Sequence, residues 1–225
     1  MQQHKHYSFD LWDTLIKPNP RFKKERAKYF HTICHKMGLL RNRDEIEDTF
    51  KEVWKYFDSI SKLFGKAPNY LEMYAMVIFR LTGSLKNLTP LKMQLMYKDV
   101  EKLFLENPPS LYDEDTYGVL EELQIRGKTL SLLSNTSFIH GDTLDQVLEI
   151  LDIKHRFVFR LYSDKIGYSK PCQECFRMVD DKLPYDVEDI IHVGDDIVND
   201  GMGAQEYGFS HMIINSNQFT IKDLL

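Results

Sequence analysis

The sequence predicts an α/β fold in which a parallel sheet carries an inserted, all-helical module, and the patterns of apolar residues predict it. From residue 113 onward, short apolar runs alternate with stretches of helical spacing, as in proteins whose parallel strands are joined by helices. Between residues 21 and 105, apolar residues recur at intervals of three and four, which is typical of helices. A further apolar run at residues 7–9 supplies the first strand of the sheet.

Two proline-containing segments separate these patterns. Residues 18–20 read Pro-Asn-Pro, and residues 107–109 read Asn-Pro-Pro. Proline has no amide hydrogen to donate and its ring obstructs a continuing helix, so both segments are expected to be hinges. We therefore expect residues 1–17 and 113–225 to form the α/β core domain, and residues 18–112 to form a helical domain inserted into it.

Glycine and proline also set the limits of individual elements. Gly38, Gly65 and Gly83 each follow a run of helical spacing, as expected of residues that end helices. Thr89 and Pro90 are typical of a helix start, because threonine caps the first turn and proline suits its first position. The expected helices span residues 22–37, 46–64, 69–81, 89–107, 115–126, 144–151 and 220–225, with one more after Pro171, and the expected strands span residues 7–9, 129–133, 157–161, 190–193 and 212–214.

The composition argues against several kinds of partner. The chain has 225 residues, of which 43% are hydrophobic, enough to fill a core without disulfide bonds. Its 29 basic and 34 acidic residues give a net charge of -5 without long runs of either sign, so we expect neither nucleic acid nor a membrane as partner. Apolar runs fall short of the roughly 18 residues that span a bilayer, and the polar start lacks a signal peptide's apolar core. We expect a cytoplasmic protein with a small-molecule ligand.

Cysteine and histidine residues are expected to be structural. Cys172 and Cys175 form a C-x-x-C pair, but a second pair at zinc-binding spacing is missing from the sequence. His31, Cys34 and His35 share one helical turn and could hold a metal, although helical spacing often produces such neighbours. Three cysteines also fit a reducing compartment better than a disulfide framework.

Aromatic residues are frequent in the helical part, and two interpretations of them stay open. Trp54, Tyr56, Tyr70 and Tyr74 could line a pocket. Aromatic residues at helical spacing more often belong to a core, and we expect that for these four.

Polar residues follow several predicted strands at the point where each strand ends. Asp10, Ser134 and Asp195 come directly after strands, and Lys170 stands in a strand-to-helix connection. Each alone is compatible with a capping or turn residue. Together they should meet at one edge of a parallel sheet, where a nucleophilic carboxylate, a hydroxyl group and a cation are suited to handling phosphate. Aspartates so close repel each other unless a cation is present, which favours Mg²⁺.

At this point the chain resembles the haloacid dehalogenase-like hydrolases, in the subgroup with a helical cap between the first and second motifs. The resemblance implies a Rossmann-like core and places the cap at residues 18–112. The motifs that carry it are Phe9-Asp10-Leu11-Trp12-Asp13-Thr14-Leu15, Ser134-Asn135, Lys170-Pro171, and Val193-Gly194-Asp195 with Asn199-Asp200 and Gly203-Ala204.

The resemblance implies a role for each residue of the predicted site. Asp10 is expected to be the nucleophile that takes up a phosphoryl group from a small phosphorylated substrate. Ser134 and Lys170 are expected to hold the transferring oxygens. Asp10 and Asp195 are expected to bind Mg²⁺, with Asp200 behind them.

Position 12 departs from the family pattern. The backbone carbonyl of Trp12 is expected to bind the same Mg²⁺, but phosphatases of the family carry an aspartate here as general acid and base. Indole cannot shuttle a proton at neutral pH, and loss of a positioned acid typically costs about 10² to 10⁴ in rate. Asp13 is adjacent but stands at the family's usual glycine position. Leaving groups of low pKa, such as acyl or aryl phosphates, should suffer least.

Three functional hypotheses follow from the residues and the resemblance. The first is a Mg²⁺-dependent phosphohydrolase that works through an aspartyl-phosphate at Asp10. The second is a carbon-halogen hydrolase, in which an aromatic residue such as Trp12 is familiar at this position and a metal is not needed. The third is a binding protein that keeps the pocket and has lost turnover.

Overall fold

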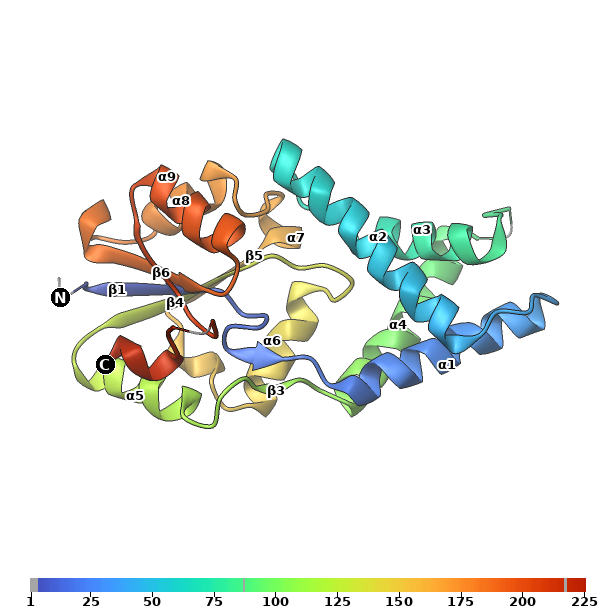
Figure 1. The fold of residues 1–225 in the computed structure, drawn as a ribbon, viewed down its shortest axis with the longest axis horizontal. Helices are drawn as coiled ribbons and strands as arrows, with labels where there is room; N and C mark the ends of the chain where they lie inside the picture. The colour runs from blue at the N-terminus through green and yellow to red at the C-terminus, as the bar shows by residue number, and fades with distance from the viewer. Residues whose placement is uncertain (1–3, 87, 217) are drawn as a thin grey trace.

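A computed structural model describes residues 4–86, 88–216 and 218–225, which form a sheet lobe and a helical lobe (Figure 1). The sheet contains five parallel strands in the order β5-β4-β1-β6-β7, so β1 (His6–Phe9) lies at its centre. This arrangement confirms the predicted α/β fold with a parallel sheet. The other strands are β4 (Thr129–Ser134), β5 (Phe159–Tyr162), β6 (Ile190–Gly194) and β7 (Ser210–Ile213).

Helices cover both faces of this sheet (Figure 1). One face carries α5 (Thr116–Ile125) and α6 (Gly141–Ile150), and the other carries α8 (Gln173–Asp180) and α9 (Gly203–Tyr207). A buried apolar cluster that includes Leu133 and Phe176 fills the space beneath α8 and α9. Short elements complete the lobe: α7 (Ser163–Ile166), the 3₁₀ segments Lys154–Arg156, Val187–Asp189 and Ile221–Leu224, and a π-helical turn, η3 (Ile197–Met202).

The helical lobe is built from four helices with well-formed ends. Asn42 and Glu45 form a reciprocal capping box at the start of the second helix, and Gly65 ends it in the left-handed conformation. Phe30, Phe50 and Tyr74 pack at the centre of the lobe. The helices are α1 (Pro20–Lys36), α2 (Arg43–Phe64), α3 (Tyr70–Thr82) and α4 (Pro90–Glu106), within one to three residues of the expected limits.

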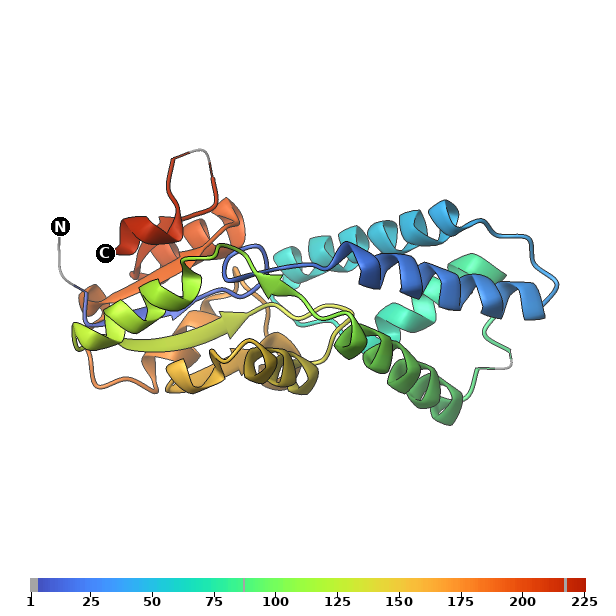
Figure 2. The ribbon, with the colours of Figure 1, turned by 90° about the horizontal axis from the view of Figure 1, so that it is seen from below.

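A pair of short strands joins the two lobes. β2 (Ile16–Lys17) and β3 (Ser110–Leu111) run antiparallel, so the chain leaves and re-enters the sheet lobe at one place (Figure 2). The division into domains at residues 17 and 112 stays a prediction. β2 ends at the first of these positions, and β3 lies next to the second. In the part of the chain that the structure describes, no helix is long and apolar enough to cross a membrane.

Several local expectations are refined by the structure. The segment at residues 220–225 forms a short 3₁₀ helix, and β5 begins two residues later than expected. Cys175 is fully buried among apolar side chains and Cys172 packs against the same cluster, as expected of structural cysteines. Within the described residues, the only group of three or more His, Cys, Asp or Glu side chains placed to share a metal lies elsewhere, at the end of the sheet.

Candidate active site

The carboxyl ends of three neighbouring strands bring the predicted site together. Asp10 follows β1, Ser134 ends β4, and Asp195 follows β6, and these strands are adjacent and parallel. The amide of Asp10 donates to the carbonyl of Val193 at 2.8 Å, which continues the pairing of β1 with β6 beyond the last strand residue. Parallel pairing therefore fixes where the acidic side chains start.

Lys170 lies between two aspartates at the centre of the site. Its Nζ donates to Oδ1 of Asp10 and to Oδ1 of Asp200, both at 2.6 Å, and the side chain is 1% exposed. Asn135 holds the backbone of Lys170 on both sides, because its Oδ1 accepts from the Lys170 amide at 2.8 Å and its Nδ2 donates to the carbonyl at 2.9 Å. A residue from the end of β4 thus orients the lysine.

Asp200 supports the loop that carries Asp195. Its Oδ2 accepts from the amides of Asp195 at 3.2 Å and Asp196 at 3.0 Å, while its Oδ1 also lies 3.0 Å from Nε2 of His192. The carboxylate fits beside Gly194, where a Cβ atom would lie 2.1 Å from Cγ of Asp200. Both oxygens of Asp200 are therefore already in use.

Thr14 and Ser134 place hydroxyl groups in the site. Oγ1 of Thr14 donates to Oδ2 of Asp10 at 3.4 Å and to Oδ1 of Asp195 at 3.3 Å, so it sits between the two carboxylates. Oγ of Ser134 is buried and makes no hydrogen bond to any described residue. Such an orphaned hydroxyl is costly unless another group binds it.

Burial dominates the electrostatics of the site. It raises the pKa of Asp10 to about 7, against the pull of Lys170, and raises the pKa of Asp195 to about 6, with help from the charge of Asp200. Burial also opposes the charge of Asp200, but Lys170 and His192 outweigh it and hold the pKa of Asp200 below its ordinary value. Burial disfavours the ammonium of Lys170, yet Asp10 and Asp200 hold its pKa above the ordinary value.

The carboxylates are suited to a divalent cation. One ligand oxygen from each of Asp10, Asp195 and Asp200 lies within 4.8 Å of the others. Asp10 and Asp200 share the ammonium of Lys170, and Asp195 adds a third carboxylate. Hard oxygen donors with excess negative charge are what Mg²⁺ prefers. Among the described residues, Asp200 has four hydrogen-bonding partners, whereas Asp10 has two and Asp195 has one. Asp10 and Asp195 therefore have more lone pairs left to offer an ion. Trp12, whose carbonyl is the other predicted ligand, lies in the loop after β1 and bridges to Ile16.

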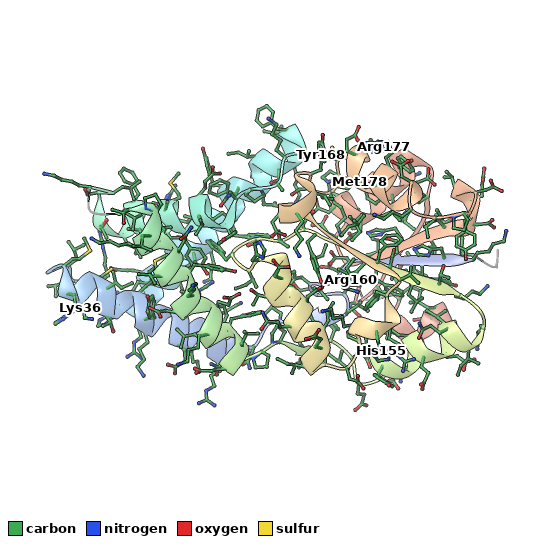
Figure 3. The ribbon with its side chains drawn as sticks, turned by 180° about the vertical axis from the view of Figure 1, so that it is seen from behind. Lys36, His155, Arg160, Tyr168, Arg177 and Met178 are labelled. Carbon is green, nitrogen blue, oxygen red and sulfur yellow. The ribbon has the colours of Figure 1, made fainter. Side chains whose placement is uncertain are left out.

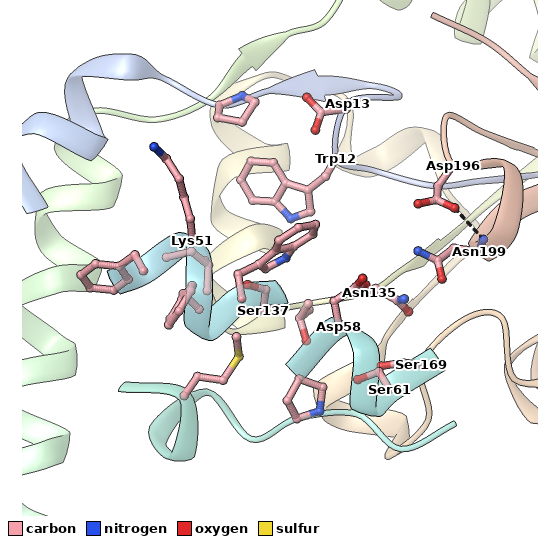
Figure 4. Close-up of a pocket in the computed structure, with 18 of the residues that line it drawn as sticks. Trp12, Asp13, Lys51, Asp58, Ser61, Asn135, Ser137, Ser169, Asp196 and Asn199 are labelled. Carbon is pink, nitrogen blue, oxygen red and sulfur yellow. Dashed lines mark hydrogen bonds between the residues drawn. The ribbon is translucent and has the colours of Figure 1, made fainter. Parts of the chain in front are cut away.

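A cavity of about 490 Å³ opens above these residues, between the two lobes (Figure 4). Asp10, Lys170 and Asp195 line its floor, and side chains from α1, α2 and α4 line its other walls. Trp12 points from the loop after β1 towards α2 (Figure 4). Trp54 also lines the cavity and is 46% exposed, and Tyr56 is 48% exposed, so the expectation that these two belong to the core of the helical lobe is wrong, whereas Tyr74 is fully buried as expected.

The helical lobe also touches the loop that carries Lys170. The amide of Ser169 donates to the carbonyl of Gly65 at 2.9 Å, and the amide of Ala67 donates to the carbonyl of Gly167 at 3.1 Å. Tyr168, between them, lies where the end of α2 meets the sheet lobe (Figure 3). Backbone hydrogen bonds thus join the end of α2 to the loop that carries Lys170.

A comparison with models of known families decides the family. The model described as haloacid dehalogenase-like hydrolase matches residues 4–208, which is most of the chain. The chain belongs to the haloacid dehalogenase-like hydrolases. It is therefore an enzyme of a family that generally uses Mg²⁺ and acts on small substrates. A comparison with curated proteins gave no match.

Solved structures of this family share the fold. YfnB from Bacillus subtilis, bound to magnesium, is 16% identical with a TM-score of 0.71, over 96% of this chain and 91% of its own. A HAD phosphatase from Thermococcus onnurineus is 18% identical with a TM-score of 0.67, over 98% and 95%. A 2-haloacid dehalogenase from Pseudomonas syringae is 18% identical with a TM-score of 0.66, over 96% and 92%. These likenesses concern the fold and include members with a cap.

Three residues of this hydrolase site were given no role from the sequence. Thr14 stands within the first motif, His192 is a polar residue inside the buried strand β6, and Asn135 follows Ser134 in the second motif. A histidine within a buried apolar run signals a partner that satisfies its ring, and here the partners are Asp200 and Ser8. Thr14 and Asn135 could be located in the sequence, but their contacts depend on how loops that are distant in the chain meet.

Proposed function

We propose that this hydrolase is a Mg²⁺-dependent phosphohydrolase that works through an aspartyl-phosphate at Asp10. The observation that carries the proposal is the cluster of three carboxylates at the end of the parallel sheet, in which buried Asp10 and Asp200 both pair with Lys170 and Asp195 is half-buried beside them. An uncompensated acidic cluster is costly to bury, and a bound cation together with an anionic substrate would make use of it. Bound Mg²⁺ would neutralise charge on the phosphoryl oxygens.

The chain's own residues have distinct tasks in this proposal. An Oδ atom of Asp10 forms a bond to phosphorus, and the leaving oxygen departs with the electron pair of the broken P–O bond. Lys170 holds the Asp10 carboxylate and offers positive charge to the transferring oxygens. Ser134, whose hydroxyl lacks a partner among the described residues, would donate to another of these oxygens. Water then releases phosphate from Asp10.

The experiment is a screen of phosphorylated metabolites for phosphate release, with Mg²⁺ and with a chelator. We expect hydrolysis that requires Mg²⁺ and is lost in Asp10→Asn. The matched control is Asp189→Asn, which changes an exposed ion pair with Lys5 at the opposite end of β6. Activity that survives Asp10→Asn would reject the proposal.

A second candidate is carbon-halogen hydrolysis, and Trp12 favours it. An aromatic side chain occupies the position two residues after Asp10 and lines the cavity. The arrangement of Asp195 and Asp200 around the cation site counts against it, because that chemistry does not need a metal. Release of halide from 2-chloropropionate that is unaffected by chelator and lost in Asp10→Asn would establish this candidate instead.

A further inference from the structure

The wall of the active-site cavity is rich in aromatic rings. Most of them are nearly buried and form the back of the wall, whereas Trp12 is half-buried and Trp54 is 46% exposed. The two tryptophans therefore present uncovered ring surface to the cavity. The aromatic residues that line it are Trp12, Phe22, Phe50, Trp54, Phe104 and Phe138.

Five of these rings contact another ring, either within the helical lobe or between the two lobes. Phe22 and Phe104 meet edge to face with centroids 5.0 Å apart, and Trp12 lies 6.3 Å from Phe104. Phe50 and Phe138 meet in the same manner at 5.0 Å. Contacts of this kind fix the orientation of these five rings. The wall is therefore a prepared apolar surface, of the sort that binds a flat apolar group.

The charged group behind this wall is already neutralised. The guanidinium of Arg26 lies 3.7 Å from the ring centroid of Phe50 and donates to both oxygens of Glu47, at 3.2 and 2.9 Å. The side chains of Arg26 and Glu47 are 9% and 19% exposed. A charged substituent placed against Phe50 would compete with this pair, so this part of the wall favours an uncharged aromatic group. Lys23 and Lys51 line another part of the cavity.

The same cavity offers little help to a basic leaving group. Trp12 occupies the position two residues after Asp10, and its indole is not an acid at neutral pH. The carboxylate of Asp58 is paired with Lys62 at 3.0 Å, and Asp196 accepts from the amides of Val198 and Asn199 at 2.8 Å. With Glu47 held by Arg26, three acids of the wall are engaged elsewhere. Asp13 is the acid of this wall that these pairings leave open. A leaving oxygen that is stable as an anion needs no proton from it.

We infer, resting on the proposed function, that the substrate is a phosphate monoester of an aromatic hydroxyl group. The ring lies against Trp12 and Trp54, and the phosphate lies over Asp10. Asp10 forms its bond to phosphorus while the P–O bond to the ring breaks, and the electron pair leaves on the aryl oxide without a proton. Water then attacks phosphorus, the bond to Asp10 breaks, and the released phosphate keeps both protons of that water.

The first test separates recognition of the ring from acidity of the leaving group. It compares phenyl phosphate with the phosphate ester of hexafluoroisopropanol, a non-aromatic alcohol somewhat more acidic than phenol. Acidity alone would make the second ester react faster. We expect kcat/KM to be about tenfold or more higher for phenyl phosphate, from burial and stacking of the ring. Equal or faster hydrolysis of the non-aromatic ester would overturn the inference.

The second test measures binding without turnover. Isothermal titration in Mg²⁺ compares phenylphosphonate with methylphosphonate, which differ only in the apolar group. We expect Trp54→Leu to weaken phenylphosphonate binding about three- to tenfold and to leave methylphosphonate unchanged. The control is Tyr56→Leu on the same helix, because Tyr56 is 48% exposed and does not line the cavity. Equal losses in both variants, or no preference for the phenyl ligand, would refute ring binding.

Two controls keep this inference apart from the proposed function. Acetyl phosphate has a good leaving group and no ring, so its Mg²⁺- and Asp10-dependent hydrolysis tests the proposed function alone. Asp13 also lines the cavity, and the contacts described above do not assign it a role. Rapid hydrolysis of alkyl phosphates that disappears in Asp13→Asn would show a proton donor and overturn the inference while leaving the phosphohydrolase standing.

Discussion

At the scale of single residues, the missing side chain of Gly194 provides the space for the Asp200 carboxylate. We expect Gly194→Ala to abolish turnover and to lower the free energy of unfolding by about 1 to 3 kcal/mol, as overpacking does. The reason is that its Cβ would lie 2.1 Å from Cγ of Asp200. Gly118→Ala is the control, since open space surrounds Gly118 within α5 and the change should be neutral or slightly stabilising. Equal urea midpoints for both variants would contradict this.

A second residue-scale prediction concerns His6 in the central strand. Its ring is buried and contacts Thr129 Oγ1 at 2.7 Å and Ser131 Oγ at 2.8 Å. Burial lowers the pKa of His6 from 6.5 to about 4, so between these values the unfolded chain binds a proton that the folded chain does not. His6 therefore makes the free energy of unfolding fall as the pH drops from 6.5 towards 4, by about 1.4 kcal/mol per pH unit.

The measurement is urea unfolding at several pH values within this range. We expect His6→Gln to show a shallower dependence on pH than the unchanged protein. His155→Gln serves as the control, because the side chain of His155 is 56% exposed and lies outside the sheet. An unchanged slope in His6→Gln would show that this ring does not titrate as described.

At the scale of elements, the end of α2 joins the helical lobe to the Lys170 loop. Gly65 has φ +68° and would bring a Cβ within 2.6 Å of Sγ of Cys172, whereas Gly83 has a similar φ of +74° with open space around it. Both alanine variants carry the same backbone cost, about 1 kcal/mol. We expect Gly65→Ala to lower kcat/KM at least severalfold more than Gly83→Ala, because it displaces the contact next to Ser169. Equal kcat/KM values for the two variants would show that this contact does not affect catalysis.

The elements differ in how far the sequence could predict them. The capping residues Asn42 and Thr89 and the glycines after the first three helices locate the helical lobe within a few residues, because these signals act locally. The π-helical turn η3 depends on two contacts: Asp196 caps its start, and Asp200 within it pairs with Lys170, which lies in a different loop. The short pair β2 and β3 depends on two distant segments meeting. Neither has a local pattern from which it could be predicted.

The residues of the candidate site also differ in how far the sequence could predict them. Asp10, Ser134, Lys170 and Asp195 could be located because each marks the end of a predicted strand or a loop that follows one. Trp54 could not, since helical spacing alone does not tell a residue that faces the core from one that faces a cavity between lobes. Its exposure depends on how the helical lobe is placed over the sheet.

At the scale of the whole molecule, one apolar cluster runs through both lobes. It includes Leu132 of the sheet, Phe22 and Phe50 of the helical lobe, and Phe138 in the loop after β4, with Trp12 packed against it. A shared core couples the unfolding of the parts that build it. We therefore expect the two lobes to unfold together.

Two optical probes can test this coupling. The two tryptophans of the sequence, Trp12 and Trp54, both line the cavity between the lobes, so their fluorescence reports on that junction. Far-ultraviolet circular dichroism reports mainly on the helices. We expect both signals to change at the same urea concentration with the same slope. Loss of fluorescence at a lower concentration would show that the lobes separate before either unfolds.

If Asp10 accepts a phosphoryl group, peptide mapping by mass spectrometry can detect that group on its carboxylate. The protein is mixed with acetyl phosphate and Mg²⁺, quenched in acid within the first turnovers and digested. We predict one phosphoryl group on Asp10, absent when chelator is present and absent in Asp10→Asn. Rapid hydrolysis of acetyl phosphate with Asp10 unmodified, or with the label on another residue, would contradict the account.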